Sequence, residues 1–142
     1  MNSIRVVLWA GYVLLAGCRM GETDIRGRWV VSDVYCKSCD VGLLRSEVGT
    51  LMEFSNQVIR NPLTGDCHAS PSYGPFETRD VKSLTRDFEL SQQWTGGKEV
   101  VMVGAIKCRG IDFMPVIVLA PDVIIYIFEG GTTFLLERQS SR

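Results

Sequence analysis

The chain has 142 residues, which is enough for one domain. With 15 Lys and Arg against 16 Asp and Glu, the net charge is −1, which argues against a nucleic-acid-binding protein that works through a basic surface. Apolar residues make up 46% and charged residues 22%, which excludes a wholly disordered chain. The single His excludes a metal site built from three histidines.

The first elements in the chain form an export signal, expected over residues 1–17. An apolar run from Val6 to Ala16 has the length of a signal-peptide core and is too short to span a bilayer as a helix. The run ends in Leu-Leu-Ala-Gly-Cys, residues 14–18. This ending resembles the lipobox of bacterial lipoproteins, and the resemblance implies that Cys18 carries a diacylglycerol and that the signal is removed before it. The alternative is an ordinary secretory signal or an uncleaved anchor, with no role for Cys18.

The lipobox resemblance also implies a location. In many lipoproteins an Asp directly after the lipidated Cys keeps the protein in the inner membrane, whereas this chain has Arg19. We therefore expect a lipid anchor in the outer membrane on its periplasmic face, with inner-membrane and cell-surface retention as alternatives. Acyl chains, at about 0.8 kcal/mol per buried methylene, hold such a protein firmly. Residues 18–25 are expected to form a lipidated tether, and residues 26–142 the folded domain.

Four further cysteines predict two disulfides in an oxidising compartment, with three pairings to choose from. Cys36 and Cys39 can close a small loop, which leaves Cys67 for Cys108. One alternative is a redox site at the Cys-x-x-Cys spacing, but Gly42 would end the helix that such chemistry requires. Another is a zinc site formed by these cysteines or by His68, which an oxidising location disfavours. We expect no metal.

Between the signal and the last third of the chain the sequence predicts short elements separated by turn-forming residues. Asn56 marks the turn of a hairpin, and Gly49 ends a helical turn. Three prolines and two glycines predict an ordered loop over residues 61–75. The expected elements are a strand from Gly27 to about Tyr35, a helical turn over 41–48, a hairpin from 50–55 and 57–60, and a helix near 80–88.

The last third of the chain has the clearest pattern. Four β-branched and aromatic runs, separated by two or three turn residues, predict consecutive antiparallel hairpins over 99–108, 111–119, 123–128 and 132–137. The run from Val123 to Phe128 is apolar on both faces, so its outer face must be covered by a helix or loop. Pro115 implies an edge position or a bulge in its strand.

Gly27-x-Trp29 at the start of the first strand, with a meander that ends in Arg138, resembles the lipocalin and calycin pattern. The resemblance implies a mainly β fold: a small antiparallel up-and-down (lipocalin-like) β-barrel with one or two short helices, with Trp29 at its closed end and Arg138 stacked across the indole. Such a contact stabilises by about 0.5–2 kcal/mol. With the lipobox, the loop from Cys67 to Tyr73 and the late Cys, the chain also looks like small bacterial lipoproteins of unassigned function. The long loop argues against a deep ligand cavity.

The sequence offers few catalytic candidates. His68 has Ser70 and Ser72 nearby, but the Gly-x-Ser-x-Gly elbow of a serine hydrolase is absent. We therefore expect no enzyme, no catalytic residue and no cofactor. Tyr73, held between prolines and next to a disulfide, is suited to project into a partner's cleft, and His68, Ser70 and Ser72 would join it in a partner-binding loop. In the alternative, Tyr73 packs back over the barrel mouth.

Two functions remain. The first is a non-catalytic binding module that holds a small apolar ligand, which calls for an open barrel interior. The second is a periplasmic inhibitor or immunity lipoprotein, similar in architecture to lysozyme inhibitors, which blocks a cell-wall or membrane hydrolase. That function calls for a filled interior and an exposed, rigid loop around Tyr73.

Overall fold

The computed structural model describes residues 23–128 and 131–140, without the side chain of Phe113. The expected signal peptide (1–17), Cys18 and residues 19–22 of the tether lie outside the described residues. The described helices are α1 (Val41–Leu44), the short 3-10 helix η1 (Arg45–Glu47), α2 (Val81–Phe88) and α3 (Gln92–Thr95). The described strands are β1 (Gly27–Cys36), β2 (Leu51–Phe54), β3 (Ile59–Arg60), β4 (Ser72–Tyr73), β5 (Glu77–Asp80), β6 (Val100–Cys108), β7 (Ile111–Ala120), β8 (Val123–Ile127) and β9 (Thr132–Arg138).

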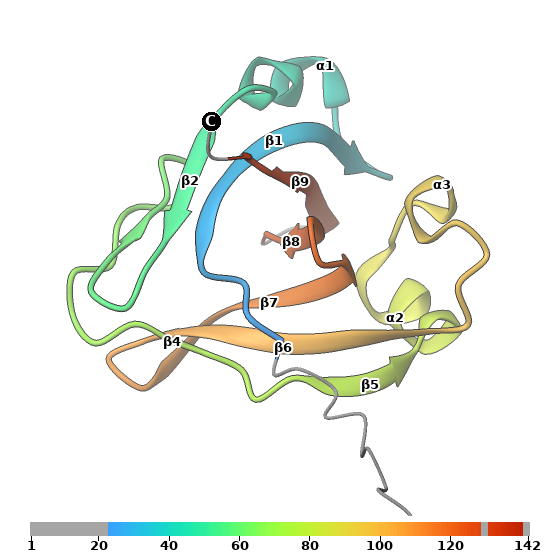
Figure 1. Cartoon of the computed structure of the whole chain (residues 1–142). Helices are drawn as coiled ribbons and strands as arrows, with labels where there is room; N and C mark the ends of the chain where they lie inside the picture. The colour runs from blue at the N-terminus through green and yellow to red at the C-terminus, as the bar shows by residue number, and fades with distance from the viewer. Residues whose placement is uncertain (1–22, 129–130, 141–142) are drawn as a thin grey trace, which may run out of the picture.

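The strands form one antiparallel sheet that curls around its own interior (Figure 1). The hairpins predicted in the last third are confirmed as the meander β6-β7-β8-β9. β1 pairs with β9 along its length, from Trp29 opposite Arg138 to Cys36 opposite Thr132. The two ends of the described chain therefore meet in the middle of the sheet. The mainly β, antiparallel prediction with few short helices is confirmed at this level.

The sheet is a curled half-barrel, because its strand path begins at β3 and ends at β4. The up-and-down order holds for β1 to β3 and for β6 to β9, whereas β4 and β5 both pair with the same edge of β6. The loop between β3 and β4 spans the gap. Its Cys67 pairs with Ile59 through two backbone hydrogen bonds, and the Cys67–Cys108 disulfide joins it to the end of β6. Pro62 and Pro71 in this loop have no N–H to continue a strand ladder.

Two apolar cores lie on opposite faces of the sheet, and β8 contributes to both. Ile124 and Tyr126 face the inner core, which also contains Trp29 and Phe54. The neighbouring residue Ile125 faces an outer core, which α2 covers with Leu84. This explains why the β8 sequence is apolar on both faces. The interior is tightly packed, since the side chains of Trp29, Phe54 and Tyr126 are each less than 2% exposed.

Close packing extends to the backbone of β6. The ring of Phe76 lies over Gly104, where a Cβ would come within 2.5 Å of Phe76 Cδ1. Asn61 is buried, and its side-chain amide donates to the Tyr126 hydroxyl, which fixes the loop after β3 to the interior. No helix in the described part of the chain is long and apolar enough to cross a membrane.

Pro115 was predicted to lie at an edge position or a bulge of its strand, and β7 is irregular around it. β7 pairs with β8 only from Val116 onward, so at Pro115 the ladder continues on the β6 side alone. The register between β6 and β7 shifts two residues before the proline, between Met114 and Asp112. The missing N–H of Pro115 therefore faces the side on which the β8 ladder has ended.

Candidate functional site

The guanidinium of Arg138 joins three segments at one end of the sheet. Its Nη1 donates to the carbonyl of Arg26 at 2.6 Å, its Nη2 to Asp24 at 3.0 Å and its Nε to Pro121 at 3.1 Å. Its Cζ lies 4.3 Å from the centroid of the Trp29 ring. Arg138 thus holds the start of the described chain against the β7–β8 turn and the indole.

Gly27 makes this arrangement sterically feasible. Its φ of +137° is a conformation that residues with a side chain rarely adopt, and a Cβ would lie 2.7 Å from Arg138 Nη1. The Trp29 Nε1 donates to the carbonyl of Ile25 at 2.8 Å, and Ile25 is only 1% exposed. The Gly-x-Trp sequence and the distant Arg therefore form one structural unit. We call residues 24–26, which this unit holds, the strap.

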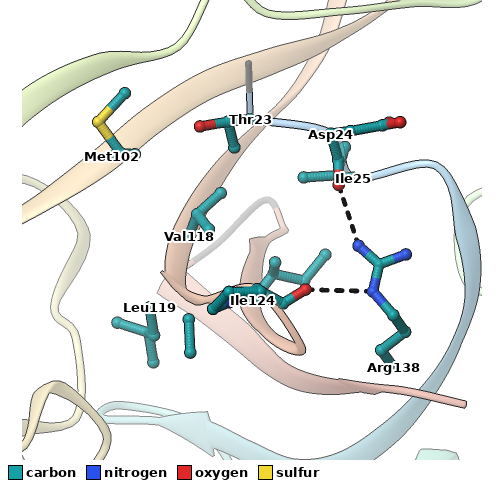
Figure 2. Close-up of a pocket in the computed structure, with 10 residues that line it drawn as sticks. Thr23, Asp24, Ile25, Met102, Val118, Leu119, Ile124 and Arg138 are labelled. Atoms are coloured by element: carbon teal, nitrogen blue, oxygen red, sulfur yellow. Dashed lines mark hydrogen bonds between the residues drawn. The ribbon is translucent and has the colours of Figure 1, made fainter. Parts of the chain in front are cut away.

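An apolar groove of about 560 Å³ lies on one side of the strap (Figure 2). Met102, Val118 and Ile124 form the wall that continues the inner face of the sheet, and the strap and Arg138 lie opposite. Its volume falls within the range of small-molecule sites, about 300–1,000 Å³. The groove is lined by Thr23, Asp24, Ile25, Met102, Val118, Leu119, Ala120, Pro121, Ile124 and Arg138.

A second hollow, of about 350 Å³, lies on the other side of the strap and is polar. Its lining shares Thr23 and Asp24 with the groove and adds Arg26, Asn56, Pro71, Ser72 and Tyr73. Arg26 pairs with the carboxylate of Asp24 at 2.8 Å and also donates to Asn56 Oδ1 at 2.7 Å. The hydrogen bonds from Arg26 lower the pKa of Asp24, so this carboxylate stays ionised.

A third hollow, of about 680 Å³, lies beside Tyr35. It is therefore near the C-terminal end of β1, whereas the strap precedes the N-terminal end of this strand. Its lining is polar and includes two basic side chains, Lys37 and Arg86, and one acidic side chain, Glu89. The Trp94 indole lies nearby, with its ring centroid 6.0 Å from that of Tyr35. Its Nε1 donates a hydrogen bond to the Asp33 carboxylate at 3.3 Å. The two ends of β1 therefore carry different surfaces, one partly apolar and the other polar.

The predicted partner-binding loop is held in place at both ends. His68, Ser70 and Ser72 are exposed. His68 Nε2 lies 3.8 Å from the carboxylate of Asp66. Tyr73 is half-buried: its hydroxyl donates to the Ser55 carbonyl at 2.8 Å, and its ring lies 6.0 Å from Phe54. Tyr73 thus packs against the end of β2. Within residues 23–128 and 131–140, no group of three His, Cys, Asp or Glu side chains is placed to hold a metal ion.

All four cysteines of the described chain are paired as their spacing favoured. Cys36 bonds to Cys39, and Cys67 bonds to Cys108 across 41 residues of sequence. The second bridge stabilises by about 3–4 kcal/mol in a chain-entropy estimate. Because it joins the loop after β3 to β6, it also fastens the open side of the half-barrel.

Sequence reasoning identified Gly27, Trp29 and Arg138 but missed the groove beside them. The groove draws its lining from the strap, β6 and the β7–β8 hairpin, segments that are far apart in sequence. Comparison of the chain with models of protein families, with curated proteins and with solved structures finds no match. Function is therefore inferred from the sequence pattern and geometry of this chain.

The three-carbonyl contact predicts that Lys cannot replace Arg138. An ammonium is a compact charge without the planar fork, so it cannot reach carbonyls from Asp24, Arg26 and Pro121 together. We expect Arg138→Lys to lower the free energy of unfolding by about 2–4 kcal/mol, measured by urea denaturation. Arg28→Lys, an exposed substitution on β1, is the control and should change it by less than about 0.5 kcal/mol. Equal effects of the two variants would contradict the role given to Arg138.

Burial raises the pKa of Tyr73 to about 12, above the ordinary value of 10.0 for a tyrosine. The unfolded chain therefore loses this proton first, so its contribution to stability is complete below pH 10 and is lost as the pH rises toward 12. Burial also raises the pKa of Tyr126. We expect Tyr73→Phe to flatten the fall in unfolding free energy over this alkaline range. Urea denaturation at a series of pH values measures the slope, and an unchanged slope in the variant would show that Tyr73 is not its source.

Proposed function

We propose that the chain is an envelope lipoprotein with a lipocalin-like half-barrel, anchored through Cys18 in the outer membrane and facing the periplasm, that binds a small apolar molecule without transforming it. The lipobox pattern supports the anchor. The Gly27–Trp29–Arg138 unit supports the lipocalin-like fold, because the guanidinium lies 4.3 Å from the indole centroid where β1 and β9 pair. The observation that carries the binding function is the apolar groove beside the strap.

Two features favour binding at the groove over binding inside the barrel. The interior is filled by Trp29, Phe54 and Tyr126, each fully buried. The groove, in contrast, has a volume of about 560 Å³ next to apolar walls of β6 and β7. The small apolar ligand expected from the sequence is therefore assigned to the end of the sheet and not to its interior.

The groove's chemistry suits binding more than catalysis. Its two charged side chains are already engaged, Asp24 with Arg26 and Arg138 with backbone carbonyls. His68, the one imidazole of the chain, belongs to the exposed loop, and its side chain is 73% exposed. General acid–base catalysis needs a titratable group within hydrogen-bond reach of a bound substrate. We therefore infer that the chain is not an enzyme.

A second candidate function is inhibition of a cell-wall or membrane hydrolase. The filled interior and the loop fixed by Cys67 and Tyr73 both favour it. The contact residues would then be the exposed side chains of His68, Ser70 and Ser72, since the hydroxyl of Tyr73 is engaged with Ser55. A hydrolase that co-purifies in equal amount with the chain and is inhibited by it would favour this function over the apolar-ligand site.

Anchoring through Cys18 predicts a specific change in mass and location. Protein extracted from membranes should carry a diacylglyceryl group on an N-terminal Cys18 in mass spectrometry. Cys18→Ser should release the chain from the membrane fraction, because the sulfur that holds the diacylglyceryl group through a thioether is lost. Arg19→Lys, at the next position, keeps the lipidated Cys and should stay in the membrane. A Cys18→Ser protein that is still membrane-bound would overturn the anchor.

A further inference from the structure

Three features meet at the strap end of the sheet. The apolar groove lies on one side of the strap and the polar hollow on the other, and both are lined by Thr23 and Asp24. Thr23 follows Cys18 by five residues. A fully extended segment of that length spans at most about 18 Å. A lipid on Cys18 would therefore keep both hollows close to the membrane surface.

The two hollows match the two halves of an amphipathic molecule. On the groove side Met102 and Val118, both partly exposed, offer apolar contacts (Figure 2). On the other side Ser72 is exposed and supplies a hydroxyl, and Asn56 is also part of the lining. The charges of Asp24 and Arg26 offset each other, so this side favours hydrogen bonding over binding of a net charge.

We propose that this end of the sheet binds one single-chain lipid drawn from the adjacent bilayer, with its acyl chain in the groove and its polar head across the strap beside Ser72. The inference rests on the proposed function for the nearness of the membrane. The site lies at the Trp29–Arg138 end, which the lipocalin resemblance implied would be closed. Arg138 keeps the strap in place, so it positions both halves of the site without donating to the ligand's chain.

The length of the acyl chain should set the affinity. Each methylene that leaves water for an apolar site strengthens binding about fourfold when it is fully buried, and about twofold when it is half-buried. Met102 and Val118 in the groove lining are only partly buried, so we expect about two- to fourfold per methylene until the groove is full. Beyond that length the gain should end.

Trp29 provides a local reporter for the test. The chain has three Trp residues, and Trp9 belongs to the signal peptide that the proposed processing removes, so Trp94→Phe leaves Trp29 as the only indole of the lipidated protein. This protein, purified from membranes, is reconstituted in phosphatidylcholine vesicles and titrated with a fatty acid brominated along its chain. Bromine quenches tryptophan fluorescence only at short range, and the groove is lined by Arg138, which covers the Trp29 ring. We expect saturable quenching, competed by unbrominated fatty acids with the chain-length dependence given above.

Matched variants assign the quenching to the groove. Ala120→Phe fills the groove and should weaken binding about tenfold, equivalent to roughly two methylene contacts. Ile111→Phe, on the same strand but next to the β6–β7 turn and 72% exposed, should leave binding unchanged. Ser72→Ala should weaken binding about fivefold through one lost hydrogen bond, with the same dependence on chain length. An unchanged affinity in Ser72→Ala overturns the placement of the head.

A flotation assay separates this inference from the anchor. Protein that floats with the vesicles, while Trp29 is not quenched, overturns the acyl site and leaves the anchor standing. Protein that does not float, while the fatty acid in solution still quenches Trp29 with the expected chain-length dependence, supports the acyl site and overturns the anchor. The chain-length series uses no groove variant, so it still tests whether an acyl chain binds in the groove if Ala120→Phe fails to fold.

Discussion

The contact of one guanidinium with three backbone carbonyls fixes the end of the sheet on which the functional account depends. Arg138, near the end of the chain, reaches Asp24 and Arg26 at the start of the described region and Pro121 in the β7–β8 turn. A hydrogen bond from a charged donor contributes about 1.5–3 kcal/mol, so three such bonds from one side chain favour a single position of these segments. The bonds hold the strap in one position, and the strap divides the apolar groove from the polar hollow.

The strands that could be predicted are those whose own residues select them. The runs that became β6 to β9 are β-branched, and short turns between them leave antiparallel pairing as the simple arrangement. β5 could not be predicted, because its sequence, Glu77–Asp80, has no large apolar residue and is a strand only because it pairs with β6. β4 is two residues long and also depends on β6. Local pattern indicates a strand only where burial, and not an edge pairing, holds it.

In the candidate site, too, some residues could be predicted from the sequence and others could not. Gly27, Trp29 and Arg138 were indicated by a short motif and a resemblance, and the steric reason for Gly27 became visible only with the guanidinium in place. The groove gave no local signal, because strands distant in sequence supply its walls. Ile25 was expected in a tether, yet it is buried under the Trp29 contact. Because the interior is filled, the apolar ligand that we propose is assigned to the end of the sheet, beside the strap.

The most direct test of this account is to map which surface of the protein faces the bilayer in which we propose that it is anchored. The protein purified from membranes, placed in nanodiscs that contain a spin-labelled lipid, can be followed through its methyl resonances in NMR. The account predicts that Met102, Val118 and Ala120, which line the groove, are broadened most. The exposed apolar side chains Leu43 and Val48, near α1 and η1, provide the comparison. Strongest broadening at Leu43 and Val48, with the groove methyls unaffected, would contradict it.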